Sequence, residues 1–139
     1  ALVLYAAALS AIGPMVSAAL TKKPISNTGS IKAVGVGVYW DQACVNPVSE
    51  IPWGLLEPGS DVSKTIYVQN DGNTATSLSM TTSGWDPLNA SNYITLTWDY
   101  DGQTLNVGAV IQVKLTLSVS SNISGITDFS FLITITANG

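Results

Sequence analysis

Few side chains in this sequence could carry out catalysis or bind a metal ion. The chain contains no His and a single Cys, Cys44, so imidazole catalysis, imidazole metal sites and an intrachain disulfide are excluded. Cys44 lies in the stretch DQACVNP with no basic neighbour to lower its thiol pKa, and we interpret it as a small packing residue or, alternatively, an intersubunit disulfide. No nucleophile–base pair is evident. The sequence therefore predicts no enzyme, no catalytic or metal-binding residue and no cofactor.

Two short acidic motifs resemble ligand loops but are better explained as turns. Asp99-Tyr100-Asp101-Gly102 has the Asp spacing that opens a calcium loop, yet no Glu follows at the required distance. We expect Asp101-Gly102 to form a two-residue hairpin turn, and Asn70-Asp71-Gly72-Asn73 to form a turn of the same kind.

Four Trp residues could stack on sugar rings or fill the core. Aromatic side chains dominate the cores of small domains, so we expect Trp98 in the core and Trp85 at an edge of the fold. The four residues are Trp40, Trp53, Trp85 and Trp98.

Two Asn-x-Ser tripeptides are candidate N-glycosylation sites. Asn89-Ala90-Ser91 and Asn122-Ile123-Ser124 each fall between predicted strands, where a glycan can be accommodated on an exported protein. We therefore predict glycan attachment at Asn89 and Asn122.

The composition is poor in charge. Charged residues make up 10% of the 139 residues, with five Lys, no Arg and a net charge of −4, whereas soluble domains average about 25%. The negative net charge and the lack of Arg argue against nucleic acid as the main partner. Abundant Ser, Thr and Asn replace the missing charges, which is typical of a surface that packs against neighbours or carries glycans.

The N-terminal segment carries no charged side chain, and the first charged residue of the chain is Lys22. A helix of 20 residues at about 1.5 Å per residue spans roughly 30 Å, the thickness of a bilayer core. Three interpretations of this segment are open. It is an uncleaved secretory signal ending at Ala18, it is a transmembrane anchor, or it is a hydrophobic helix that leaves the membrane to pack against copies of itself. Gly13-Pro14 interrupts it, and we expect a helix break there.

After residue 30 the apolar residues alternate with polar ones, as in strands with one buried face. The clearest runs are 63–70, 77–83, 93–100, 110–119 and 127–137, and the run 32–40 (KAVGVGVYW) is predicted to be one further strand. Residues 24–30 (PISNTGS) read as a linker. About seven short strands predict a mainly β protein, an immunoglobulin-like antiparallel β-sandwich after an N-terminal hydrophobic α-helix.

This layout of an apolar N-terminal helix, a short linker and a Ser/Thr-rich sandwich resembles that of archaeal type IV pilins. The resemblance implies that a peptidase cuts ahead of the apolar segment, which stays in the mature protein. It also implies that the helix resides in the membrane before entering the core of an adhesive pilus. Tyr5 stands where bacterial pilins carry Glu, which favours the archaeal branch.

The sandwich is also similar to exported camelysin-like and TasA-like fibre domains. The shared pattern comprises Trp53-Gly54, Leu56, Pro58-Gly59-Ser60, Val68, Asn70 and Gly72-Asn73. In those proteins the apolar N-terminus is a cleaved signal, and subunits join by donating a strand to a neighbour.

We therefore expect an extracellular, homopolymeric filament subunit with a helix at 1–23, a linker at 24–30 and a sandwich at 31–139. The alternatives are a signal-cleaved fibre subunit joined by strand donation and a membrane-anchored β-sandwich that binds carbohydrate or a cell-surface partner. The residues expected to pack in the filament core are Leu2, Leu4, Tyr5, Leu9, Ile12, Met15, Val16 and Leu20, and the expected helix break is at Gly13 and Pro14.

Overall fold

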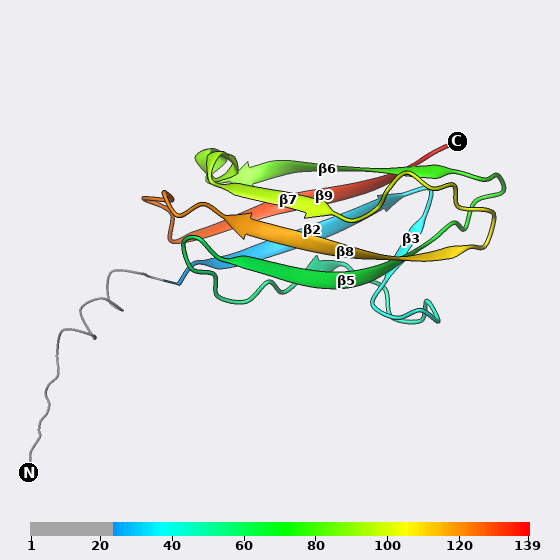
Figure 1. Cartoon of the computed structure of the whole chain (residues 1–139), viewed down its shortest axis with the longest axis horizontal. Coiled ribbons are helices and arrows are strands. Elements are labelled where there is room, and N and C mark those ends of the chain that lie inside the picture. Colours follow the sequence, from blue (N-terminus) through cyan, green and yellow to red (C-terminus); the bar gives the residue numbers. More distant parts are fainter. Residues whose placement is uncertain (1–23) are drawn as a thin grey trace, which may run out of the picture.

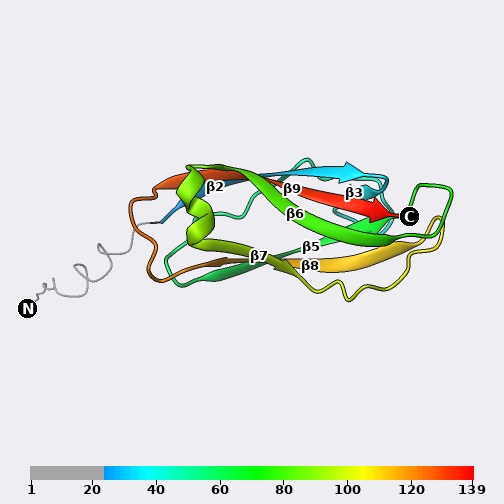
Figure 2. The same cartoon turned by 90° about the horizontal axis from the view of Figure 1, so that it is seen from above.

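The computed structural model describes residues 24–139, and the expected N-terminal helix lies outside the described residues. The described part is mainly β, as predicted, and its eight strands form two four-stranded sheets that pack face to face (Figures 1 and 2). The first sheet has the order β4 (Glu50–Ile51), β2 (Ser26–Val34), β9 (Asp128–Asn138), β6 (Ser77–Asp86). The second has the order β3 (Gly37–Tyr39), β5 (Asp61–Gln69), β8 (Val110–Val119), β7 (Ile94–Trp98), and a short 3₁₀ helix, η2 (Leu88–Asn92), joins β6 to β7.

The core lies between the sheets, and the alternation of apolar and polar residues explains it. Every second side chain of β8 and β9 points inward, because successive side chains of a strand face opposite sides of the sheet. The fully buried members include Val113, Leu115, Leu117, Ile133 and Ile135, all at most 1% exposed. Their alternate neighbours are mostly hydroxyl-bearing residues on the outer faces of the two sheets.

One strand pair departs from the antiparallel arrangement that the sequence suggested. β2 and β9 are parallel over nine residue pairs, from Ser26 beside Asp128 to Val34 beside Thr136. Every other strand pair in residues 24–139 is antiparallel. Parallel neighbours need a long crossover connection, and here the whole chain between β2 and β9 supplies it.

The predicted linker and first strand are wrong in their boundaries. Residues 26–30 belong to β2, where all five pair with β9 and the last two, Gly29 and Ser30, also pair with β4, so they need few apolar side chains of their own. The single strand predicted for 32–40 is two strands in different sheets. Gly35, at φ +79°, makes the bend between them, a conformation that glycine adopts without steric cost.

The two Gly-containing turns also differ from expectation. β7 and β8 are joined by residues 99–109 rather than by a two-residue turn, and the Asn70–Asn73 segment passes from β5 in one sheet to β6 in the other. Thr76 and Leu105 exchange two backbone hydrogen bonds, of 2.7 and 2.9 Å, that hold the long loop against the start of β6.

The buried side chain of Asn70 ties these two connections together. Its amide nitrogen donates to the carbonyls of Thr74 (2.8 Å) and Leu105 (2.9 Å), and its amide oxygen accepts the N–H of Gly72 (3.0 Å). Because Asn70 is only 1% exposed, these bonds satisfy the amide group of a side chain that is shielded from solvent.

We predict that Asn70→Ala lowers the free energy of unfolding by about 3 kcal/mol, because it removes three hydrogen bonds at about 1 kcal/mol each. Chemical denaturation of the full chain measures the change. Asn73→Ala, at an exposed position of the same turn, is the matched control and should stay within about 0.5 kcal/mol of the parent. Equal stability of the two variants would contradict the proposed role of the Asn70 side chain.

Candidate functional site

The candidate functional site is the end of the sandwich to which residues 1–23 attach. Pro24 is exposed, whereas Ile25 is only 3% exposed and exchanges backbone hydrogen bonds of 2.7 and 3.0 Å with Leu56. The next residue, Ser26, donates its N–H to the carbonyl of Thr127 at 3.3 Å. The described chain is thus hydrogen-bonded to the rest of the sandwich from residue 25 onward.

A shallow groove lies beside this attachment point. It has a volume of about 310 Å³ and is formed by Ile25, by Pro58 in the β4–β5 connection, and by residues 123–127 in the β8–β9 loop. Ile126 is buried beneath it and Ile123 is half-buried. The groove therefore offers a partly apolar surface directly next to residue 24.

Both candidate glycosylation residues lie at this same end. η2, which carries Asn89, and the β8–β9 loop, which carries Asn122, lie at the end of the sandwich where β2 starts, as two perpendicular views show (Figures 1 and 2). Both Asn side chains are exposed. Sequence reasoning identified the two tripeptides, but their place at one end of the sandwich depends on the topology.

The two tripeptides differ in local structure. Asn89 sits inside the 3₁₀ helix, where the Ser91 hydroxyl donates to the carbonyl of Leu88 at 3.2 Å. Asn122 lies in an open turn held by its own N–H, which donates to the Ser120 hydroxyl at 3.1 Å. Glycan acceptors favour exposed surface loops, so Asn122 has the more suitable setting.

The four Trp residues are mainly structural. Trp53 is 3% exposed and fills the space over Gly29 in β2, where a Cβ atom would lie 2.6 Å from the indole nitrogen. Trp85 stacks on Phe131 with ring centroids 4.4 Å apart, next to an irregularity in edge strand β6, in agreement with its predicted place. Trp98, predicted to be in the core, is only half-buried and packs against Tyr100.

A second groove contains the fourth Trp. Trp40 borders it together with Thr28, Glu50 and Pro52, and its volume is about 480 Å³. An indole ring, a carboxylate and a hydroxyl are groups that can contact a sugar. The groove lies along the β2–β4 edge of the first sheet.

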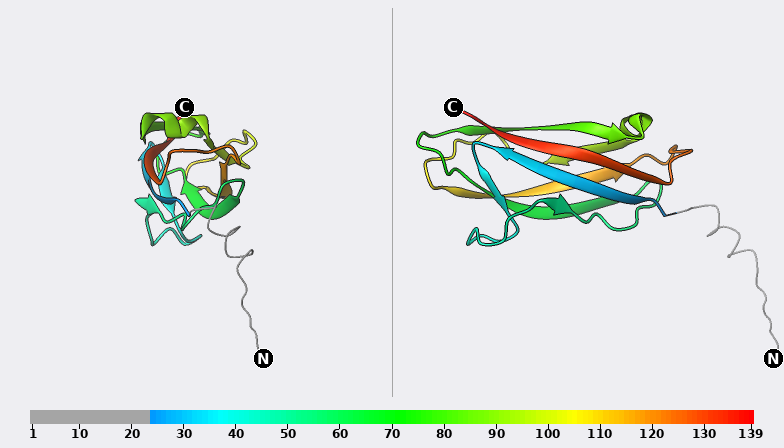
Figure 3. Two further views of the ribbon diagram at one scale, coloured as in Figure 1. Left: turned by 90° about the vertical axis from the view of Figure 1, so that its left-hand side faces the viewer. Right: turned by 180° about the vertical axis from the view of Figure 1, so that it is seen from behind.

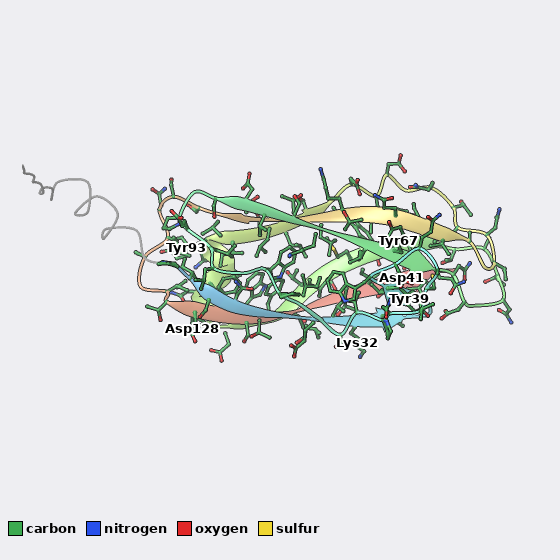
Figure 4. All side chains as sticks on the ribbon, turned by 90° about the horizontal axis from the view of Figure 1, so that it is seen from below. Lys32, Tyr39, Asp41, Tyr67, Tyr93 and Asp128 are labelled. Atoms are coloured by element: carbon green, nitrogen blue, oxygen red, sulfur yellow. The ribbon has the colours of Figure 1, made fainter. Side chains whose placement is uncertain are left out.

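The β3–β4 loop, which contains Cys44, has little reactivity. Asp41 in that loop accepts the N–H groups of Asn46 (2.9 Å) and Val45 (3.1 Å), which lowers the pKa of the Asp41 carboxyl. Desolvation, reinforced by the Asp41 charge, raises the pKa of the Cys44 thiol and keeps it protonated at neutral pH. Figure 4 labels Asp41 at the end of the sandwich opposite the attachment point.

Acidic residues do not gather into a metal site in residues 24–139, where no three His, Cys, Asp or Glu side chains lie together. Asp99, half of the calcium-like motif, instead accepts the backbone N–H of Lys114 at 2.8 Å. The residues expected in the filament core, Leu2, Leu4, Tyr5, Leu9, Ile12, Met15, Val16 and Leu20, and the expected break at Gly13-Pro14, lie outside the described residues.

The free edges of the sheets are short or partly covered. β4 spans two residues and β3 three, and the segment after β3 bonds back to it through Val48, whose N–H donates to the carbonyl of Val38 at 2.9 Å. The start of β6 is covered by the 99–109 loop, where the Tyr100 hydroxyl accepts the N–H of Leu78 at 3.0 Å. Covered and short edges resist pairing with strands of other chains.

Comparison with protein-family models and with curated proteins finds no match to this chain. Among residues 24–139, no helix has the length and apolar character needed to cross a membrane.

We predict higher glycan occupancy at Asn122 than at Asn89 in the protein isolated from its native cells, because the Asn122 tripeptide lies in an open loop. Mass spectrometry of glycopeptides measures the occupancy of each site. Ser124→Ala should remove the glycan from Asn122, and Ser91→Ala is the matched change at the other site. A glycan found on Asn89 with Asn122 bare would contradict the prediction.

Proposed function

We propose that this chain is the structural subunit of an extracellular archaeal type IV-like pilus. Residues 1–23 form a hydrophobic α-helix that resides in the membrane before assembly and then packs against copies of itself in the filament core. The sandwich, which we place among immunoglobulin-like folds, forms the outer surface and contacts cells or other surfaces. The proposed activity is assembly, so no catalytic residue or cofactor is assigned.

The observation that carries the proposal is that an uncharged apolar segment precedes a sandwich whose buried core is formed by later residues. Residues 1–21 contain no charged side chain. The buried core of the described sandwich is formed by side chains between residues 25 and 135. The apolar segment needs another place of burial, and at about 25 cal/mol per Å² its burial among identical segments is strongly favourable.

The surface chemistry of the head supports an exterior position. The outer face of the first sheet carries rows of hydroxyl side chains from β2, β9 and β6, at register positions that place them side by side. They include Thr28, Ser30, Ser79, Thr81, Ser130, Thr134 and Thr136. Uncharged hydroxyls bind water yet can approach a neighbouring copy without charge repulsion.

The completeness of the sandwich favours helix-driven assembly over strand donation. β2, the first described strand, already occupies an interior position between β4 and β9. In a subunit that accepts a donated strand, one strand position would be empty before assembly, and the core residues beside it would be exposed. Here Ile133 and Ile135 of the neighbouring β9 are fully buried by the chain's own residues.

Aspartate substitutions in the apolar segment test the proposal. In Leu9→Asp/Ile12→Asp, two charges would have to be buried among packed helices, and we predict that filaments disappear while the sandwich still folds. Electron microscopy of the cell surface measures filament number, and intrinsic Trp fluorescence of the purified chain reports on the fold.

The matched control is Leu9→Ile/Ile12→Leu, which keeps the apolar character and total volume and should retain filaments. Filaments of normal number in the double-Asp variant would overturn the helix-core proposal. Loss of filaments in the control as well would show that the segment acts through something other than its apolar character, and would also count against the proposal.

A further inference from the structure

The parallel pair β2–β9 joins the two ends of the described chain in an arrangement suited to bearing tension. β2 starts two residues after Pro24, and β9 ends at Asn138, one residue before the end of the sequence. Because the strands are parallel, the start of β2 and the end of β9 lie at opposite ends of the sandwich (Figures 1 and 3). A force that separates the two termini therefore acts along both strands, in opposite directions.

The direction of force decides how hydrogen bonds share it. When two strands are pulled past one another along their length, all bonds between them are loaded together and must fail almost simultaneously. When the strands are pulled apart from one end, the load falls on one bond at a time. Pulling on residue 24 against the C-terminus produces the first case across nine residue pairs.

The hydrogen-bonding direction alternates along β2. Ser26 donates to Thr127, which precedes β9, whereas Ile31 donates to Ser49, on the side of β4. By this alternation the N–H groups of Thr28, Ser30 and Lys32 point toward β9. β2 therefore forms backbone hydrogen bonds along both of its edges, which is expected only of an interior strand.

A side chain from a neighbouring loop also blocks sliding of β2. The indole of Trp53 lies over Gly29 at a distance that leaves no room for a Cβ atom. Moving β2 two residues toward its N-terminus would bring the Ile31 side chain, on the same face of the strand, to that position. The indole would then have to leave the core, where it is 3% exposed.

We propose that β2 and β9, with Trp53 seated over Gly29, form a mechanical clamp that keeps the sandwich folded when the segment before residue 24 is pulled. The origin of the tension rests on the proposed function, because in a pilus the segment is fixed in the core while the head is held by an external surface. The clamp itself is a property of the single chain. It is testable whether or not filaments form.

Single-molecule force spectroscopy on the full chain in detergent tests the clamp. In a Cys44→Ser background, handles on Pro24→Cys and Gly139→Cys load β2–β9 lengthwise. Handles on Pro24→Cys and Thr127→Cys load the same strand pair from one end, because Ser26 and Asp128 are paired. Residues 1–23 lie outside the force path in both cases. We expect a severalfold higher rupture force in the lengthwise geometry, and equal forces would overturn the proposal.

A pair of proline substitutions locates the resistance. Ser30→Pro removes an N–H that points toward β9, whereas Ala33→Pro removes one that points to the other side, where β4 no longer pairs with β2. In the lengthwise geometry, Ser30→Pro should lower the rupture force clearly and Ala33→Pro should leave it near that of the parent. Equal effects of the two prolines would overturn the assignment to β2–β9.

If Ser30→Pro fails to fold, the comparison of the two pulling geometries in the parent still decides the question. Failure of the clamp is distinguishable from failure of the filament proposal. The first is read from rupture forces of single chains, and the second from filament counts on cells.

Discussion

The parallel pairing of β2 with β9 is the interaction on which the rest of this structure depends. It brings the first and last described strands together in the middle of one sheet, so that nearly all of the described chain lies between the two paired strands. The same pairing fixes residue 24 at one end of the sandwich and the C-terminus at the other. With β4 on its other side, β9 encloses β2, a strand whose own residues are mostly small and polar.

The sequence predicted those parts of the fold in which side-chain pattern and structure coincide. β5, β8 and β9 follow their alternating runs closely, because each has one face on the core and one on solvent. Residues 26–30 gave no such signal, since their strand is stabilised by backbone pairing with two neighbours rather than by apolar side chains. The bend at Gly35 was equally hidden within an apparently continuous run of alternating Val and Gly.

The candidate site was predictable only as separate motifs. Asn89 and Asn122 were recognisable from their tripeptides, but their place at the end of the sandwich where β2 starts follows from the connections of η2 and of the β8–β9 loop. The turn at Asn70 was read as a hairpin because nearby residues suit one. Its actual role depends on a hydrogen bond to Leu105, 35 residues away, which local sequence cannot indicate.

A filament subunit needs a folded head that does not aggregate and one surface that drives assembly. The head meets the first need through a closed core, edge strands that are short or partly covered, and hydroxyl-rich faces, and we propose that residues 1–20 provide the apolar surface for the second. The central claim is that this apolar segment remains in the assembled subunit. N-terminal sequencing of the protein in sheared cell-surface filaments tests it most directly. We predict a subunit that retains residues 1–18, and a subunit that begins at Ala19 would contradict the account.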